Sequence, residues 1–129
     1  METLPSYDWA FVAAGIIGCI VAVIHGVLLQ KLMIRPILNG AKLAETSRRL
    51  VPLLLHFSTI FWFLGGLALI IVPSFADAPT MLATAVFVGA LYGFGAIGNF
   101  WGTRGKHPGW MLLAVAVALI AYAALPLIR

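Results

Sequence analysis

The sequence predicts an all-α integral membrane protein, a four-transmembrane-helix antiparallel bundle with short loops. Of its 129 residues, 63% are hydrophobic and only 9% are charged, whereas a soluble domain carries about 25% charged and about 45–50% apolar residues. Four long apolar segments fill most of the chain, and each has roughly the 20 residues that a helix needs to cross a bilayer. We therefore expect residues 1–129 to form a single transmembrane domain.

The four predicted spans cover residues 9–30, 50–72, 81–100 and 110–128. Proline and glycine mark the breaks between them, since both residues interrupt helices. Arg35-Pro36 and Asn39-Gly40 are expected to stop the first helix. The later turns are marked by Pro73, Asp77 and Pro79, and then by Gly102, Gly105 and Pro108. Connections this short predict that consecutive helices are antiparallel.

The distribution of basic residues predicts the orientation, because loops rich in lysine and arginine stay in the cytoplasm. The first loop carries Lys31, Arg35, Lys42, Arg48 and Arg49, and the third carries Arg104 and Lys106. The second loop has no basic residue, and the N-terminal tail is acidic. Both termini are thus expected outside and loops 1 and 3 in the cytoplasm, in a bacterial inner (plasma) membrane. The same seven side chains are candidates for contact with lipid headgroups, and this placement explains the net charge of +4 without nucleic acid.

Small residues spaced about four apart mark helix faces that permit close approach in a bilayer. The first span carries Gly18, Ala22 and Gly26, and the third carries Gly89 and Gly93. These rows predict tight helix packing, with one face available to a second protein. The expected partners are therefore the lipid bilayer and either further copies of the chain or a larger membrane complex.

Two histidines, His25 and His56, are the sharpest chemical signal, because ionisable groups within spans are costly and often functional. His25 precedes Lys31 by six residues and His56 follows Arg49 by seven, which places both roughly 9–10 Å below the basic border. Three interpretations remain open at this point. The rings stabilise the bundle through hydrogen bonds, ligate a b-type haem from both sides, or serve with His107 as a metal site or proton relay. No carboxylate or thiolate lies in reach to complete a closed metal site, so none is assigned.

The stretch from His56 to Gly66 contains His56, Trp62 and the pair Gly65-Gly66. It resembles a helix of membrane proteins of the copper-resistance D type, which handle haem or copper. The resemblance covers eleven residues and adds weight to the haem interpretation.

No residue pattern indicates catalysis, and the spans hold no acidic residue of the kind that proton-coupled pumps use. The favoured function is therefore a non-enzymatic accessory subunit or a component of an oligomeric membrane assembly. The alternatives are a haem-binding redox protein that uses His25 and His56, and a small-molecule channel or carrier.

Overall fold

The computed structural model describes residues 8–128, and within that range the chain is helical, with no strand. The elements are α1 (Asp8–Leu29), the π-helical turn η1 (Gln30–Ile34), α2 (Arg35–Gly40), α3 (Glu45–Ile71), the 3-10 turn η2 (Val72–Ser74), α4 (Ala78–Thr103), α5 (Gly109–Ala124) and the 3-10 turn η3 (Leu125–Ile128). Four continuous helical segments are long and apolar enough to cross a membrane: Asp8–Gly40, Glu45–Ser74, Ala78–Thr103 and Gly109–Ile128. The prediction of four long apolar helices is confirmed.

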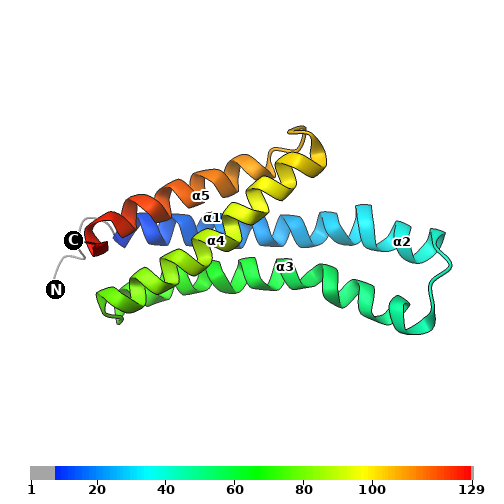
Figure 1. Ribbon diagram of the computed structural model, residues 1–129, viewed down its shortest axis with the longest axis horizontal. Coiled ribbons are helices and arrows are strands. Elements are labelled where there is room, and N and C mark those ends of the chain that lie inside the picture. Colours follow the sequence, from blue (N-terminus) through cyan, green and yellow to red (C-terminus); the bar gives the residue numbers. More distant parts are fainter. Residues whose placement is uncertain (1–7, 129) are drawn as a thin grey trace.

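Helix α1 lies at the centre of the arrangement and packs against both α3 and α5. Figure 1 shows the chain reversing direction at each connection, so that α1 begins and α5 ends at the same end of the molecule. Helix α4 crosses the other helices obliquely and packs on α5 and α3. The hairpin of α1, α2 and α3 extends beyond the turn between α4 and α5 (Figure 1).

Of the two stops expected for the first helix, the one at Arg35-Pro36 is not present, and the one at Asn39-Gly40 is confirmed, because the helix continues to Gly40 and ends there. The turn η1 makes this continuation possible. The Arg35 N–H bonds to the Gln30 carbonyl five residues back, and this wider turn gives room to Pro36, whose ring would clash with the carbonyl four residues earlier in an α-helix. The extra residue also moves the buried face: Leu29 and Ile34 are buried, whereas Met33 is 48% exposed.

Helix α3 begins at Glu45, about one turn before the predicted span at residue 50. Glu45 forms an exposed ion pair with Arg49 across that first turn, an interaction that contributes little by itself. Pro52 lies inside the helix and has no N–H to donate to the preceding turn. Figure 1 shows α3 bending near this end.

Two capping arrangements end the remaining helices. The Asp77 carboxylate accepts a hydrogen bond from the Thr80 N–H at 3.1 Å and caps the N-terminus of α4. Hydrogen bonds from the Thr80 side chain and backbone lower the pKa of Asp77 below its usual value. At the other end of α4, Arg104 and Gly105 both have positive φ, and the Gly105 N–H donates to the Phe100 carbonyl at 2.8 Å, which closes the helix in a Schellman-type turn.

The closest approach of two helices joins α1 and α3. A Cβ added at Gly15 would lie 2.5 Å from the Gly66 carbonyl oxygen, and one at Gly66 would lie 2.7 Å from the Gly15 carbonyl oxygen. Only glycine therefore permits this backbone contact. The resulting separation fixes which polar side chains of α1 and α3 face each other farther along the interface.

The small residues of the predicted packing rows have different surroundings. Gly18 receives the buried ring of Tyr92, whose hydroxyl donates to the Trp62 carbonyl at 2.9 Å. Ala22 is fully buried, a Cβ at Gly26 would lie 2.8 Å from Thr59 Cγ2, and one at Gly89 would lie 3.6 Å from Ile120. The expected packing contact at Gly93 is not present, since a Cβ there would meet no described atom within 4 Å.

Candidate functional site

His25 projects from α1 toward α3, where its Nε2 lies 3.2 Å from the Ser58 hydroxyl oxygen. The Ser58 hydroxyl donates its one hydrogen to the Leu55 carbonyl at 3.1 Å. With this hydrogen directed to Leu55, the Ser58 oxygen accepts from His25, which assigns the hydrogen of His25 to Nε2. A neutral imidazole holds one N–H, which leaves Nδ1 of His25 as a hydrogen-bond acceptor.

His56 projects the opposite way across the same interface. Its Nε2 lies 3.0 Å from the side-chain carbonyl oxygen of Gln30, an acceptor, so this nitrogen also carries a hydrogen. Gln30 is the first residue of the π-helical turn. Each histidine thus bonds to a polar residue of the other helix, in two separate pairs, His25–Ser58 and Gln30–His56.

This arrangement does not fit a haem held between His25 and His56. Nε2 of each ring is committed to a residue of the neighbouring helix, so only Nδ1 of each ring is left to ligate a haem iron. Between the two pairs, Gly26 lies so close to Thr59 that even a Cβ would come within 2.8 Å of Thr59 Cγ2. A porphyrin between these rings would have to force α1 and α3 apart.

Nor do the residues fit a metal centre. No cluster of three or more histidine, cysteine, aspartate or glutamate side chains occurs within residues 8–128. His25 and His56 each have one nitrogen committed to a neighbouring helix, and no thiolate or carboxylate joins them.

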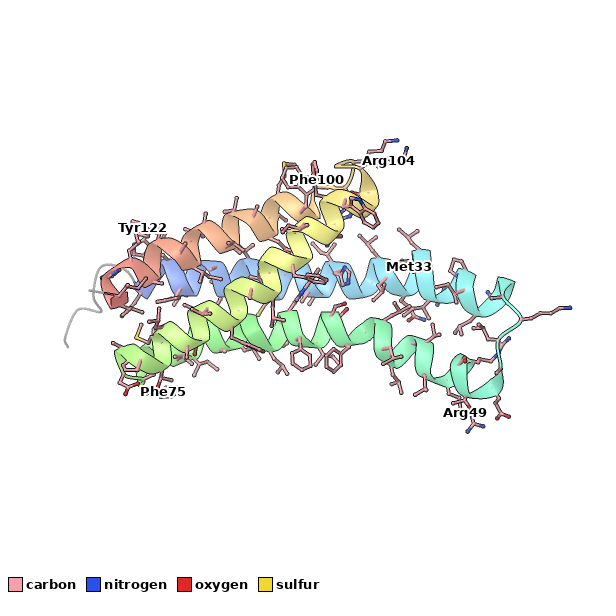
Figure 2. All side chains as sticks on the ribbon, in the orientation of Figure 1. Met33, Arg49, Phe75, Phe100, Arg104 and Tyr122 are labelled. Atoms are coloured by element: carbon pink, nitrogen blue, oxygen red, sulfur yellow. The ribbon has the colours of Figure 1, made fainter. Side chains whose placement is uncertain are left out.

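A cavity of about 360 Å³ opens beside His25, and His56 does not line it. It is bounded by the later half of α1, by Trp62 of α3, by the end of α4 and by the start of α5. Its lining residues are Val21, Ile24, His25, Leu28, Leu29, Leu32, Met33, Trp62, Asn99, Thr103, His107, Pro108, Gly109 and Leu112. Met33 is labelled in Figure 2, on the part of the first helix that lies below the α4–α5 turn in this view.

Trp62 forms the aromatic wall of this cavity. Its ring centroid lies 4.5 Å from that of His25, with the planes tilted by 44°. The indole is buried and packs on Gly95, where any side chain would overlap it. The absence of a side chain at Gly95 therefore allows α4 to hold Trp62 against His25.

The polar wall opposite comes from the end of α4 and the turn after it. Asn99 donates to the Gly95 carbonyl at 2.9 Å, and the Thr103 hydroxyl donates to the Asn99 carbonyl at 2.6 Å. The Thr103 oxygen in turn accepts from the His107 backbone N–H at 3.4 Å. These contacts fix the turn that brings His107 to the cavity.

The ring of His107 is oriented by its own turn. Nδ1 of His107 accepts the Gly109 N–H at 3.1 Å, so this nitrogen is unprotonated and Nε2 carries the hydrogen. Nε2 has no partner among the residues that the structure describes. The cavity is thus lined by two histidines with opposite free groups, an acceptor at His25 and a donor at His107.

Sequence reasoning identified His25 but gave His107 only a secondary place beside it. A sequence signal that could have identified His107 is the spacing of Asn99, Thr103 and His107, each four residues after the one before. This spacing places polar side chains along one helix face and into the following turn. The structure brings His25 and His107 to one cavity, and His56 does not line it.

The seven basic residues proposed for headgroup contact are all exposed: Lys31, Arg35, Lys42, Arg48, Arg49, Arg104 and Lys106. They lie on the long hairpin and on the α4–α5 turn. Figure 2 shows Arg49 and Arg104 toward one end of the molecule, with Phe75 and Tyr122 toward the other. The cavity opens in the half of the molecule that carries the basic residues.

Comparison with known proteins gave no relative. The chain matches no protein-family model, no curated protein and no solved structure.

Proposed function

We propose that this protein is a four-span membrane protein that binds a small, lipid-soluble molecule in the cavity beside His25. The observation that carries the proposal is the cavity itself, about 360 Å³ in volume and bounded by all four long helices. Ligand sites are typically concave, mainly apolar and of about 300–1,000 Å³, with a few polar groups that orient the ligand. The proposal corresponds to the small-molecule carrier among the functions considered from the sequence.

The lining supports a ligand that enters from the lipid phase. Most lining residues are apolar, and the polar ones are His25, Asn99, Thr103 and His107. Among the residues that the structure describes, no lysine, arginine, aspartate or glutamate lines the cavity. A charged ligand would lose its hydration without gaining an ionic partner there.

The proposal includes the orientation expected from the sequence: an antiparallel bundle with both termini outside and the basic end in the cytoplasm. The exposed basic residues on the hairpin and on the α4–α5 turn support it. In this orientation the cavity lies near the cytoplasmic interface, within reach of molecules dissolved in the inner leaflet. Assembly into an oligomer or a larger complex stays a prediction, and ligand binding is compatible with it.

Fluorescence quenching tests the proposal directly, because Trp62 is the only tryptophan that lines the cavity. A variant that keeps only Trp62, made by Trp9→Phe, Trp101→Phe and Trp110→Phe, is reconstituted in lipid nanodiscs and titrated with bromobenzene, a heavy-atom quencher. We expect saturable quenching. A second variant that keeps only the exposed Trp101 reports partitioning into lipid and should be quenched without saturation.

A matched pair of substitutions locates the binding. Leu112→Phe adds volume at a lining residue, whereas Met111→Phe makes a similar change at an adjacent exposed residue outside the cavity. We expect Leu112→Phe to weaken the saturable quenching and Met111→Phe to leave it unchanged. Non-saturable quenching of Trp62 in the parent would contradict the proposal.

A further inference from the structure

We propose that the ligand of this cavity is a neutral phenol, which donates its hydroxyl hydrogen to His25 and accepts a hydrogen bond from His107. The inference rests on the proposed ligand-binding function and names the chemical class of the ligand. It follows from the hydrogen positions that the surrounding protein imposes on the two rings.

At one wall, His25 presents an acceptor. Ser58 is held as an acceptor toward His25 because its hydrogen goes to the Leu55 carbonyl at 3.1 Å, so Nε2 of His25 donates across the 3.2 Å contact. Nδ1 is then a lone pair on a side chain that lines the cavity, without a partner in the described part of the chain. A ligand that meets this nitrogen must supply an O–H or N–H.

At the other wall, His107 presents a donor. The Gly109 N–H occupies the lone pair of Nδ1 at 3.1 Å, which leaves the hydrogen on Nε2. A ligand that meets this nitrogen must supply an acceptor oxygen or nitrogen. A hydroxyl group has the chemistry that both walls require, because it has one hydrogen to donate and lone pairs to accept.

The aromatic and uncharged lining residues narrow the chemical class of the ligand further. Trp62 and His25 supply adjacent ring surfaces with centroids 4.5 Å apart, and aromatic surfaces favour an aromatic partner. The lack of charged lining residues disfavours a carboxylate or an amine. A quinone presents only acceptors, so it would leave Nδ1 of His25 facing another lone pair, whereas a phenol or hydroquinone would not.

Two probes of nearly equal shape separate these possibilities in nanodiscs that hold the variant with Trp62 alone. In 4-bromophenol the hydroxyl both donates and accepts, whereas in 4-bromoanisole the methyl ether only accepts. One hydrogen bond contributes about 0.5–1.5 kcal/mol, so 4-bromophenol should bind about threefold to tenfold more tightly. Partitioning into lipid alone would favour 4-bromoanisole, because the ether is the more apolar probe, so it cannot account for tighter binding of 4-bromophenol.

Ser58→Ala tests the role of Ser58 in fixing the hydrogen on His25. Without the hydroxyl, His25 is free to take either tautomer, and the affinity ratio of phenol to ether should fall toward one. Thr59→Val is the matched control, since it removes a neighbouring buried hydroxyl oxygen that has no hydrogen-bond partner within residues 8–128. The parental ratio should persist in this variant.

The outcomes distinguish the two proposals. If both probes saturate with equal affinity in the parent, the cavity binds ligands but the phenol assignment is wrong. A ratio that survives Ser58→Ala would overturn the assigned hydrogen positions and with them the phenol assignment. If neither probe nor bromobenzene saturates, the ligand-binding function itself fails.

Discussion

His25 and His56 are each held by a hydrogen bond to a residue of the neighbouring helical segment. His25 and His56 stand out in the sequence because histidine is rare in an apolar span, and counting from the basic border places them at similar depth. Their partners could not be read in the same way. Ser58 and Gln30 face them across the packing of the first helical segment on α3, which is a tertiary contact.

Double-mutant cycles measure this pairing. Cycles of alanine substitutions for His25–Ser58 and for Gln30–His56 should each show a coupling of about 0.6 kcal/mol in the free energy of unfolding, the average for interhelical hydrogen bonds in a membrane protein. A His25–His56 cycle should be additive within about 0.3 kcal/mol, since the two rings share no partner. Unfolding in mixed micelles with increasing denaturing detergent gives the values, and a larger coupling between the histidines than within either pair would contradict the geometry.

At the scale of helices, the sequence predicted the small faces but not their neighbours. Spacing by four identifies residues that share one face of a helix, and this pattern is equally strong for Gly18 and for Gly93. The structure uses the first face for Tyr92 and leaves the second open toward the surroundings of the chain. Which face meets a helix depends on the oblique crossing of α4, a three-dimensional feature that no local pattern contains.

Gly66→Ala and Gly93→Ala make the same chemical change on these two kinds of face. Gly66→Ala should lower the free energy of unfolding by about 1–3 kcal/mol, the usual cost of overpacking, because its Cβ would press on the Gly15 carbonyl and on Cys19. Gly93→Ala should cost nothing in the monomer. Unfolding in detergent micelles tests both, and equal stability of the two variants would rule out the α1–α3 contact.

At the scale of the whole molecule, composition and hydropathy suffice to predict four long apolar helices. They suffice because each span is specified by its own residues, whatever its neighbours are. The cavity is different, since its walls come from α1, α3, α4 and α5 together. Because residues far apart in the sequence form these walls, the cavity became visible only in three dimensions.

Cysteine labelling of intact cells checks the orientation of the whole chain. In a Cys19→Ala background, Ser74→Cys lies at the α3–α4 connection and Ser47→Cys lies in the first turns of α3, and both positions are exposed. An impermeant thiol reagent should label the first and spare the second until the cells are opened. The reverse pattern would overturn the proposed topology.

The π-helical turn after Leu29 adds one residue to the helical turn and so displaces the buried face by one position in the sequence. Leu29 is buried, the residue four places on is exposed and the residue five places on is buried again, so the apolar stripe resumes one position late. A regular α-helix without the extra residue would bury the same face with one residue fewer. Such a helix could not keep a proline at position 36, because the ring would clash with the carbonyl four residues earlier. Related chains are therefore expected to differ by a single-residue gap between positions 30 and 34, coupled to the presence or absence of that proline.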